Sequence, residues 1–287
     1  METANHMTSA KIIDGKLIAE KINTKTARMV RELRQRGVVP QLAVVFVGHD
    51  KPSRTYIRRK KEAAEMVGIE FKLYTLPADI SKKDLVESIK KIQSNKKLSG
   101  IIVQLPLPEP LYTPEILNAI KPELDVDCLT DFQMGKLVMN TSYITPPTPT
   151  AVTTILDELK INPKGKNITI VGAGALVGKP LSIMLSNAQA TVTLCNKFTK
   201  NIKAKCLNAD IIVTAVGKKD LLRGDMVKKG TVVIDTGIAF YKHKMYGDVA
   251  FDEVAKKALH ITPTPGGVGP ITVALLLRNV VLIADKK

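Results

Sequence analysis

One lysine of the predicted helix at residues 53–67 lies among apolar side chains, where a charged group is unusual. At about 100° of turn per residue, Lys60 shares one helix face with Ile57 and Ala64, and its charged neighbours point elsewhere. Tyr56 lies one turn before it on the same side. A lysine removed from water has a lowered pKa and can exchange protons near neutral pH. The helix therefore offers a candidate catalytic amine, although a lysine at the edge of a core would show the same pattern.

A glycine-rich turn follows the predicted strand at residues 168–171 and precedes a predicted helix. It reads Gly172-Ala173-Gly174-Ala-Leu-Val-Gly178, which is the spacing G-x-G-x-x-x-G. Such a turn lets the backbone approach a pyrophosphate at the N-terminus of the helix, where free N–H groups favour an anion. Strand, turn and helix in this order favour a dinucleotide site, although glycine turns also serve packing alone.

The second strand of a dinucleotide-binding unit normally ends in a carboxylate that binds the ribose of NAD. Here the predicted strand at residues 191–194 is followed by Cys195-Asn196-Lys197, which contains no carboxylate. Lys197 therefore favours NADP, because its ammonium group could bind the 2′-phosphate. An ordinary surface lysine is the equally simple explanation.

Three further segments carry groups that suit a ligand site. The predicted buried strand at residues 101–104 ends in the amide of Gln104, and ligands bind at such strand ends in open α/β sheets. Asp125 and Asp127 would face one pocket on an extended segment, whereas in a loop they would form a turn or a cap. The loop at residues 262–270, rich in Gly and Pro, can bring bare backbone against a flat ligand.

Alternating helices and strands must position these groups. In the first half, the apolar pattern predicts helices at 15–36, 53–67, 81–93 and 114–120, and strands at 41–47, 71–75 and 101–104. In the second half, it predicts helices at 151–160, 177–185 and 272–284, and strands at 168–171, 191–194, 211–215 and 232–235. Strands separated by helices predict parallel sheets with right-handed crossovers, and the second series has Rossmann-like order.

The chain is long enough for two domains. With 287 residues, each domain can bury its own core, and two domains leave a cleft between them. The proline cluster at residues 145–150 cannot continue a helix or a central strand, so we place the boundary there. We therefore expect an α/β protein with a catalytic domain at 1–147, a Rossmann-like domain at 148–271, and a last helix, 272–287, that packs back on the first domain.

The composition narrows the class of protein. Hydrophobic residues make up 45% of the chain but aromatic residues only 4%, which favours the aliphatic cores of parallel sheets covered by helices. The 43 Lys and Arg exceed the 27 Asp and Glu, and the net charge of +16 favours polyanionic partners. No basic run is interleaved with aromatic residues as in a base-stacking surface, so the charge suits a phosphate-bearing cofactor, a polyacidic substrate or a plain solvated surface.

Cysteine spacing and hydropathy indicate the setting. Cys128, Cys195 and Cys206 show no paired spacing and the four histidines lie far apart, so we expect neither disulfides nor a metal site, as in a reducing cytoplasm. No stretch approaches the roughly 18 uninterrupted apolar residues of a membrane span, and the start of the chain lacks the apolar core of a signal peptide. Met7 offers an alternative natural start, which would leave residues 1–6 as a disordered extension.

Eight short segments, spread over nearly the whole chain, carry a resemblance to a known family. They are Lys11-Ile-Ile-Asp-Gly15, Ser53-x-x-Tyr56-x-x-x-Lys60, Val103-Gln-Leu-Pro-Leu-Pro108, Asp125-Val-Asp127, the stretch from Gly172 to Pro180, Val233-Ile-Asp-Thr-Gly-Ile238, Gly247-Asp-Val249 and Pro265-Gly-Gly-Val-Gly-Pro270. In this order they resemble the bifunctional methylenetetrahydrofolate dehydrogenase/methenyltetrahydrofolate cyclohydrolase family.

The resemblance implies two reactions: oxidation of 5,10-methylenetetrahydrofolate to the methenyl form with NADP, and hydrolysis of that form to 10-formyltetrahydrofolate. It implies that Lys60 carries the proton transfers of the second step, with Gln104 hydrogen-bonded to it. Tyr56 would stack along the aminobenzoyl ring of the substrate. Asp127 would hold the pterin, and Asp125 would be structural support.

The resemblance also implies the lining of both pockets and the partners. The folate pocket would include Val103, Leu105, Pro265, Gly266, Gly267 and Gly269. The NADP site would include Gly172, Ala173, Gly174, Lys197 and Ile238. The implied partners are tetrahydrofolate derivatives, polyglutamylated ones among them, and a second copy in a cytoplasmic homodimer.

The chain departs from the family pattern at four positions. Cys128 stands for a glycine, Pro147 for a cysteine, Gly174 for a serine and Asn196 for a histidine. Gly174 and Asn196 lie at positions that the resemblance assigns to cofactor contacts, so NAD is kept as a second candidate beside NADP. Two rival functions also fit parts of the sequence. One is a monofunctional dehydrogenase on the same scaffold, and the second is a basic, non-catalytic nucleotide- or RNA-binding protein, which would bind nucleic acid in a salt-sensitive way.

Overall fold

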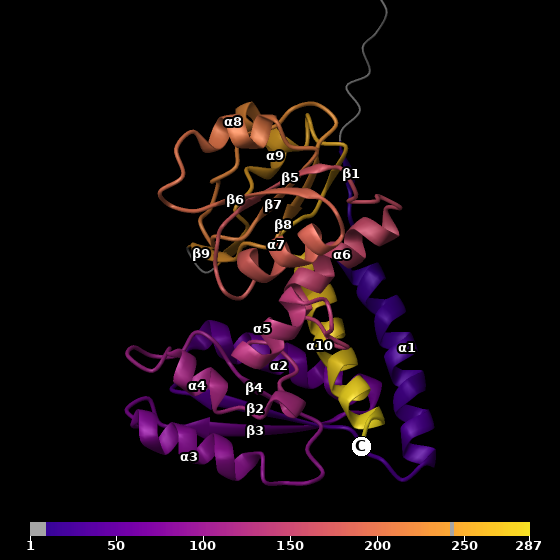
Figure 1. Cartoon of the computed structure of the whole chain (residues 1–287), viewed down its shortest axis with the longest axis vertical. Helices are drawn as coiled ribbons and strands as arrows, with labels where there is room; N and C mark the ends of the chain where they lie inside the picture. Colours follow the sequence, from indigo (N-terminus) through magenta and orange to yellow (C-terminus); the bar gives the residue numbers. More distant parts are fainter. Residues whose placement is uncertain (1–9, 242–243) are drawn as a thin grey trace, which may run out of the picture. The chain divides into compact units, whose positions relative to one another are not determined.

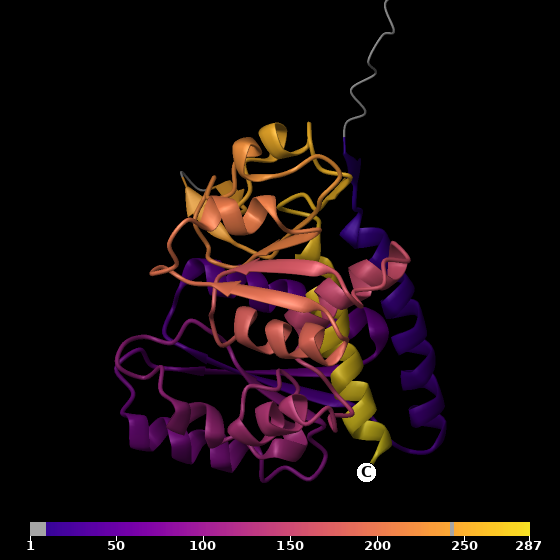
Figure 2. The same ribbon diagram turned by 45° about the horizontal axis from the view of Figure 1, so that its top comes forward.

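The computed structural model describes residues 10–241 and 244–287, so the expected extension at residues 1–6 lies outside the described part. The chain divides into two compact units. The N-terminal unit comprises Ala19–Pro147 and Val273–Lys287, and the C-terminal unit comprises the residues up to Ile18 and Thr148–Thr272. Figures 1 and 2 show the ribbons of both units from two directions.

The first described segment belongs to the C-terminal unit, whereas the predicted domain 1–147 included it. Strand β1 (Lys11–Ile12) pairs in parallel with β11 (His260–Ile261), which is part of the sheet of that unit. A strand of two residues carries no periodic pattern from which its partner could be predicted.

The N-terminal unit is a small parallel sheet between two layers of helices. Its strands are β2 (Gln41–Val47), β3 (Glu70–Leu76) and β4 (Gly100–Val103). Its helices are most of α1 (Gly15–Gln35), α2 (Lys51–Val67), α3 (Lys82–Ile92), α4 (Pro114–Asn118), η1 (Pro122–Leu124), α5 (Asp131–Val138) and most of α10 (Val268–Asp285). The sheet order is β3-β2-β4. Every residue of the central strand β2 is buried, and successive side chains point to opposite faces. Leu42 and Val44 join a hydrophobic cluster with α1, α2 and α10, whereas Ala43 and Val45 join one with α3 and α4.

The C-terminal unit contains a larger parallel sheet with Rossmann-like order. Besides β1 and β11, its sheet contains β5 (Asn167–Val171), β6 (Thr191–Cys195), β7 (Ile211–Thr214) and β8 (Val232–Asp235). Its helices are α6 (Pro147–Glu158), α7 (Gly178–Asn187), α8 (Ile202–Leu207), η2 (Gly224–Met226) and α9 (Phe251–Val254). Strands β9 (Ala239–Tyr241) and β10 (Lys244–Tyr246) form a separate antiparallel pair. The sheet order is β1-β11-β8-β7-β5-β6, with every pairing parallel. The predicted α/β class with parallel sheets is confirmed, and every predicted strand lies within one residue of its observed bounds.

Two predicted helix starts are four residues too late, and both involve proline in the first turn. Helix α6 begins at Pro147, not at residue 151, because prolines in the first turn lack only N–H groups that have no partner inside the helix. Helix α10 begins at Val268, four residues before the predicted start, with Pro270 in its first turn. The proline cluster therefore lies at the unit boundary but starts a helix there.

Among the described residues, α10 is the only helix that is long and apolar enough to cross a membrane. It is 61% buried inside the protein, and Leu276, Leu277, Val280 and Val281 belong to the same hydrophobic cluster as β2. We therefore interpret α10 as a core helix of the N-terminal unit.

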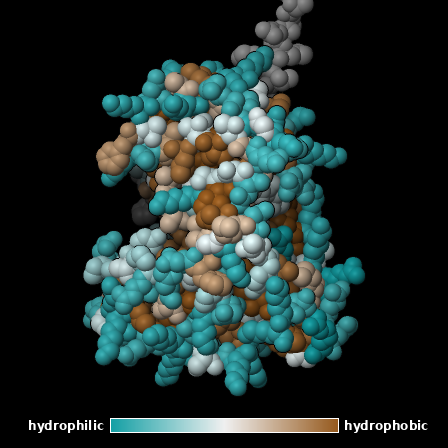
Figure 3. All heavy atoms as spheres, in the orientation of Figure 1, coloured by the Kyte–Doolittle hydropathy of each residue, from teal (hydrophilic) through white to brown (hydrophobic). Residues whose placement is uncertain are grey.

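On the face drawn in Figure 3, hydrophilic side chains surround smaller hydrophobic groups.

One buried amide ties α10 to the rest of its unit, and its loss should destabilise the protein. Asn279 is 1% exposed and donates hydrogen bonds to the carbonyl oxygens of Val126 (3.0 Å) and Thr145 (2.9 Å). Asn279→Ala removes both of these buried hydrogen bonds, so the free energy of unfolding in urea should fall by about 2 kcal/mol or more. The exposed Asn118→Ala is the control and should cost less than about 1 kcal/mol. Equal effects would contradict this interpretation.

Candidate active site and cofactor turn

Helix α2 holds Lys60 at the border between the core and the surface. The helix is capped at its start by the Asp50 carboxylate, which accepts the Ser53 N–H at 2.8 Å. It ends at Gly68, whose φ of 87° is the left-handed conformation that glycine adopts without strain. Ile57 and Ala64 are buried on the same side as Lys60, which is itself only partly exposed. The structure therefore places the Lys60 amine beside the core, as the helical spacing predicts.

Lys60 donates a hydrogen bond from Nζ to Oε1 of Gln104, over 3.0 Å. Gln104 follows directly on β4, and its own N–H continues the sheet by bonding to the carbonyl of Val45 at 2.8 Å. Its Nε2 donates to the carbonyl of Leu105 at 2.7 Å, so the amide is fixed with its oxygen toward the lysine. The amide therefore acts as a rigid acceptor that orients the amine.

Burial and charge together set the protonation of this group. Removal from water lowers the pKa of Lys60, and the nearby negative charge of Asp127 opposes part of that shift. Burial likewise raises the pKa of Asp127, while the charge of Lys60 lowers it and that of Asp125 raises it. The structure thus brings together Lys60, Gln104 and Asp127 within the N-terminal unit, with an amine that loses its proton more easily than a free lysine.

The two carboxylates of the Asp-x-Asp segment serve different neighbours. Asp125 is fully buried and accepts the N–H of Thr130 at 2.8 Å, at the start of α5. Thr130 in turn caps that helix by accepting the N–H of Gln133. Cys128, which lies between Asp125 and Thr130 in the chain, has a φ of 57°, the left-handed conformation that favours glycine. The segment is therefore a turn, in which Asp125 bonds to the start of α5 and the charge of Asp127 acts on Lys60.

Tyr56 lies one turn before Lys60 on α2, partly exposed, and burial raises the pKa of its hydroxyl. The predicted substrate residues Val103 and Leu105 flank Gln104, the first buried and the second partly exposed. These residues come from the N-terminal unit and surround the same strand end.

The loop with Pro265, Gly266, Gly267 and Gly269 belongs to the C-terminal unit. It packs against the start of α1: the N–H of Gly15 donates to the carbonyl of Gly266 at 3.1 Å, and a Cβ on Gly15 would lie 1.7 Å from the carbonyl oxygen of Gly267. The contribution of this loop to a folate pocket stays a prediction.

The glycine turn after β5 has two glycines required by packing and one beside open space. A Cβ on Gly172, whose φ is 123°, would lie 2.3 Å from the carbonyl oxygen of Ala215. One on Gly178 would lie 1.7 Å from the carbonyl oxygen of Gly172, at the start of α7. Next to Gly174, no other atom lies within 4 Å of the Cβ position. The turn thus leaves bare backbone and free space at the start of a helix, which fits a phosphate group.

The other predicted cofactor residues lie along the same edge of the sheet. Lys197 follows β6, which pairs with β5, and its exposed ammonium group lies 5.0 Å from the ring centre of Phe198. Ile238, 40% exposed, follows β8. Parallel strands end at one edge, so Gly172, Lys197 and Ile238 all lie at the carboxyl edge where ligands of such sheets bind.

Two buried carboxylates of this edge were not predicted to have a role. Asp235 ends β8 and is 4% exposed, and Asp248 is fully buried. Both lie inside segments on which the resemblance rests. In the sequence they look like ordinary turn residues, because their burial depends on tertiary packing.

Comparison with known proteins decides the family. Residues 13–127 match the family model described as the tetrahydrofolate dehydrogenase/cyclohydrolase catalytic domain, and residues 146–287 match that of its NAD(P)-binding domain. The chain belongs to the tetrahydrofolate dehydrogenase/cyclohydrolase family. The predicted resemblance is therefore confirmed.

Relatives cover nearly the whole chain. The bifunctional protein FolD of Nautilia profundicola is 44% identical over 274 residues, which are 95% of this chain and 96% of the relative. The crystal structure of FolD from Campylobacter jejuni, 38% identical, superposes with a TM-score of 0.94 over 97% of this chain and 99% of that one. The Trypanosoma brucei enzyme, solved with NADP and an inhibitor, is 34% identical with a TM-score of 0.93 and covers 97% of this chain and 98% of its own.

The glycines of the turn should differ in what they tolerate. Gly178→Ala forces a Cβ into a backbone carbonyl, so the free energy of unfolding should fall by roughly 2 kcal/mol or more, as for other overpacked sites. Gly174→Ala meets no atom and should change it by less than about 0.5 kcal/mol. Urea denaturation of both variants measures this, and a larger loss for Gly174→Ala would refute the assignment.

Proposed function

We propose that this chain oxidises 5,10-methylenetetrahydrofolate to the methenyl form with NADP and then hydrolyses that product to 10-formyltetrahydrofolate. The observation that carries the proposal is the hydrogen bond from the Lys60 amine to Gln104, next to Asp127, in a family named for both activities. Folate would bind in the N-terminal unit and NADP in the C-terminal unit, which matches the descriptions of the two family models.

In the first step, NADP supplies the acceptor for the hydride from the methylene carbon. The chain's contribution is to bind and orient. The backbone N–H groups of Ala173 and Gly174 and the start of α7 would hold the pyrophosphate, and Ile238 would line the site. Gly172, whose own N–H donates to the carbonyl of Cys195, would shape the turn. Because the space beside Gly174 is open, the absence of a larger residue there is compatible with this role.

Lys197 supports NADP over NAD. It is exposed at the end of β6, where its ammonium group can reach a 2′-phosphate, and the residues that follow this strand include no carboxylate to hold a free ribose hydroxyl. The Trypanosoma brucei relative was solved with NADP, which agrees with this choice.

In the second step, the neutral amine of Lys60 would take a proton from the water that adds to the methenyl carbon. The same proton then goes to the ring nitrogen as its bond to that carbon breaks, and the new hydroxyl loses its proton to solvent to give the formyl group. Gln104 holds the amine in place, and the lowered pKa of Lys60 supplies the neutral form. Tyr56 would stack along the aminobenzoyl ring, and Asp127 would bind the pterin.

The same residues weigh against the two rival functions. A monofunctional dehydrogenase has no need of a desolvated amine held by an amide, and the complete set of Lys60, Gln104 and Asp127 supports both activities. A nucleic-acid-binding role has only the net charge of +16 in its favour. We further propose that the protein is a cytoplasmic homodimer without a specific nucleic-acid or membrane partner, and that its substrates include polyglutamylated folates.

The central test is Lys60→Met. Cyclohydrolase activity, followed by loss of the methenyl absorbance, should fall by about 100-fold or more, because general acid–base catalysis contributes factors of that size. NADP-dependent hydride transfer should persist within about tenfold, since it needs positioning rather than proton transfer. Lys61→Met on the same helix, where the lysine is exposed and pairs with Glu65, is the control and should leave both activities unchanged. Equal loss of both activities in Lys60→Met would disprove the assigned role.

The pH dependence of hydrolysis should report on the lysine. Since burial lowers the pKa of Lys60, the hydrolysis kcat should rise with pH and level off below the pH at which a free lysine loses its proton. The charge of Asp127 favours the ammonium form, so Asp127→Asn should lower the pKa further and move the rising limb to lower pH. A limb that stays in place or moves to higher pH would show that another group controls the rate.

A further inference from the structure

Two buried acidic residues of the C-terminal unit have no part in the reaction described above. Asp248 is fully buried and Asp235 is 4% exposed, and no lysine or arginine pairs with either among the described residues. Buried carboxylates without a cation are costly unless hydrogen bonds compensate them. The direction of those hydrogen bonds indicates what the pair does.

Asp248 holds the loop after β7 with both of its oxygens. Oδ2 accepts the N–H of Val216 and Oδ1 accepts that of Lys218, each at 2.7 Å. This loop is in direct contact with the glycine turn, because the carbonyl of Ala215 is the group against which Gly172 packs. The Asp248 carboxylate therefore fixes the wall of the turn that binds the pyrophosphate in the proposed function.

Asp235 holds the neighbouring turn after β8. Its Oδ1 accepts the hydroxyl of Thr214 and the N–H of Gly237, both at 2.9 Å. Its Oδ2 accepts the N–H of Val249 at 3.0 Å. The turn held in this way continues into Ile238, one of the predicted cofactor residues.

The two carboxylates also fit against each other's backbone. A Cβ on Gly237 would lie 2.1 Å from the carboxylate carbon of Asp248, and one on Gly247 would lie 1.9 Å from Oδ2 of Asp235. Burial, together with the charge of Asp248, raises the pKa of Asp235 to about 6. The unit thus keeps two like charges close together. Their hydrogen bonds go to the end of β7, to the loops that follow β7 and β8, and to the residue after Asp248.

We propose that Asp248 and Asp235 are positioning residues for the cofactor. They hold the loop at residues 215–218 against Gly172 and the turn at residues 236–238 against Gly217, so that the binding surface for NADP is formed before the cofactor arrives. A preformed surface lowers the entropy lost on binding and therefore tightens it. This inference rests on the proposed function, because it assumes that NADP binds at this edge.

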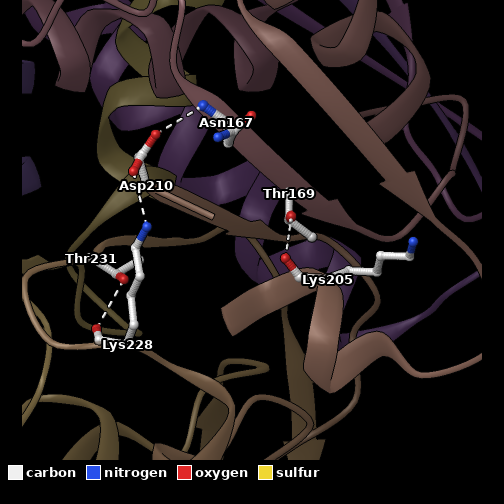
Figure 4. A network of polar contacts seen from close by, with 6 residues as sticks. All are labelled: Asn167, Thr169, Lys205, Asp210, Lys228 and Thr231. Carbon is white, nitrogen blue, oxygen red and sulfur yellow. Dashed lines mark hydrogen bonds and ion pairs between the residues drawn. The ribbon is translucent and has the colours of Figure 1, made fainter. Parts of the chain in front are cut away.

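The same unit offers a matched control at the opposite edge of the sheet. Asp210, just before β7, accepts the N–H of Asn167 at 2.9 Å, at the start of β5, and it also pairs with Lys228 at 3.0 Å (Figure 4). Like Asp248, it is a carboxylate that accepts a backbone N–H, but it also pairs with a lysine and acts at the amino ends of the strands.

The test compares Asp248→Asn with Asp210→Asn. The amide has only one accepting oxygen, so Asp248→Asn loses one of the two bonds to the loop. The Kd and KM for NADP should rise about tenfold or more, the loss expected when a bond to a charged group is removed. Hydrolysis of added methenyltetrahydrofolate should stay within twofold of wild type. Asp210→Asn should lower the urea midpoint but leave the KM for NADP unchanged.

A milder variant keeps the test decisive if Asp248→Asn does not fold. Thr214→Val removes only the hydroxyl that donates to Asp235, and we expect it to raise the KM for NADP about two- to fivefold. If these variants change the KM for NADP no more than Asp210→Asn does, the inference is refuted. If the wild-type protein itself shows no NADP-dependent turnover, the proposed function fails instead.

Discussion

Removal of the Lys60 amine from water is the constraint around which the N-terminal unit is organised. An ammonium ion at the edge of a core is costly, and the structure compensates that cost in two ways: Gln104 accepts a hydrogen bond from it, and Asp127 supplies a nearby negative charge. Each partner depends on its own support. The end of β4 fixes the amide, and the turn through Asp125 fixes the carboxylate. The protonation of the Lys60 amine is thus set by groups that the fold holds in place.

The two units solve the problem of buried charge in opposite ways. In the N-terminal unit a cation and an anion compensate each other, and the balance leaves a lysine that releases its proton more easily. In the C-terminal unit, Asp235 and Asp248 have like charges and are compensated by backbone N–H groups. The first arrangement suits proton transfer, whereas the second suits the holding of loops. This difference agrees with the separation of hydrolysis from cofactor binding.

The sequence predicted what local geometry determines. The apolar pattern placed the seven longer strands to within one residue but missed the strands of two or three residues, and helical spacing alone placed Lys60 beside the core. It could not decide between the two conformations of the Asp-x-Asp segment, because the choice depends on Thr130 and on the left-handed Cys128. The roles of Asp235 and Asp248 were also missed, since their bonds join segments that are distant in the chain and leave no periodic signal.

The glycines of the cofactor turn show how a departure from the family pattern can be judged on physical grounds. Gly172 and Gly178 contact backbone carbonyls, so a side chain at either position must disrupt the turn. The Cβ position of Gly174 faces open space, so a side chain there would have no packing role in the turn. A small residue at position 174 therefore leaves the packing of the turn intact, whereas a side chain at Gly172 or Gly178 would not.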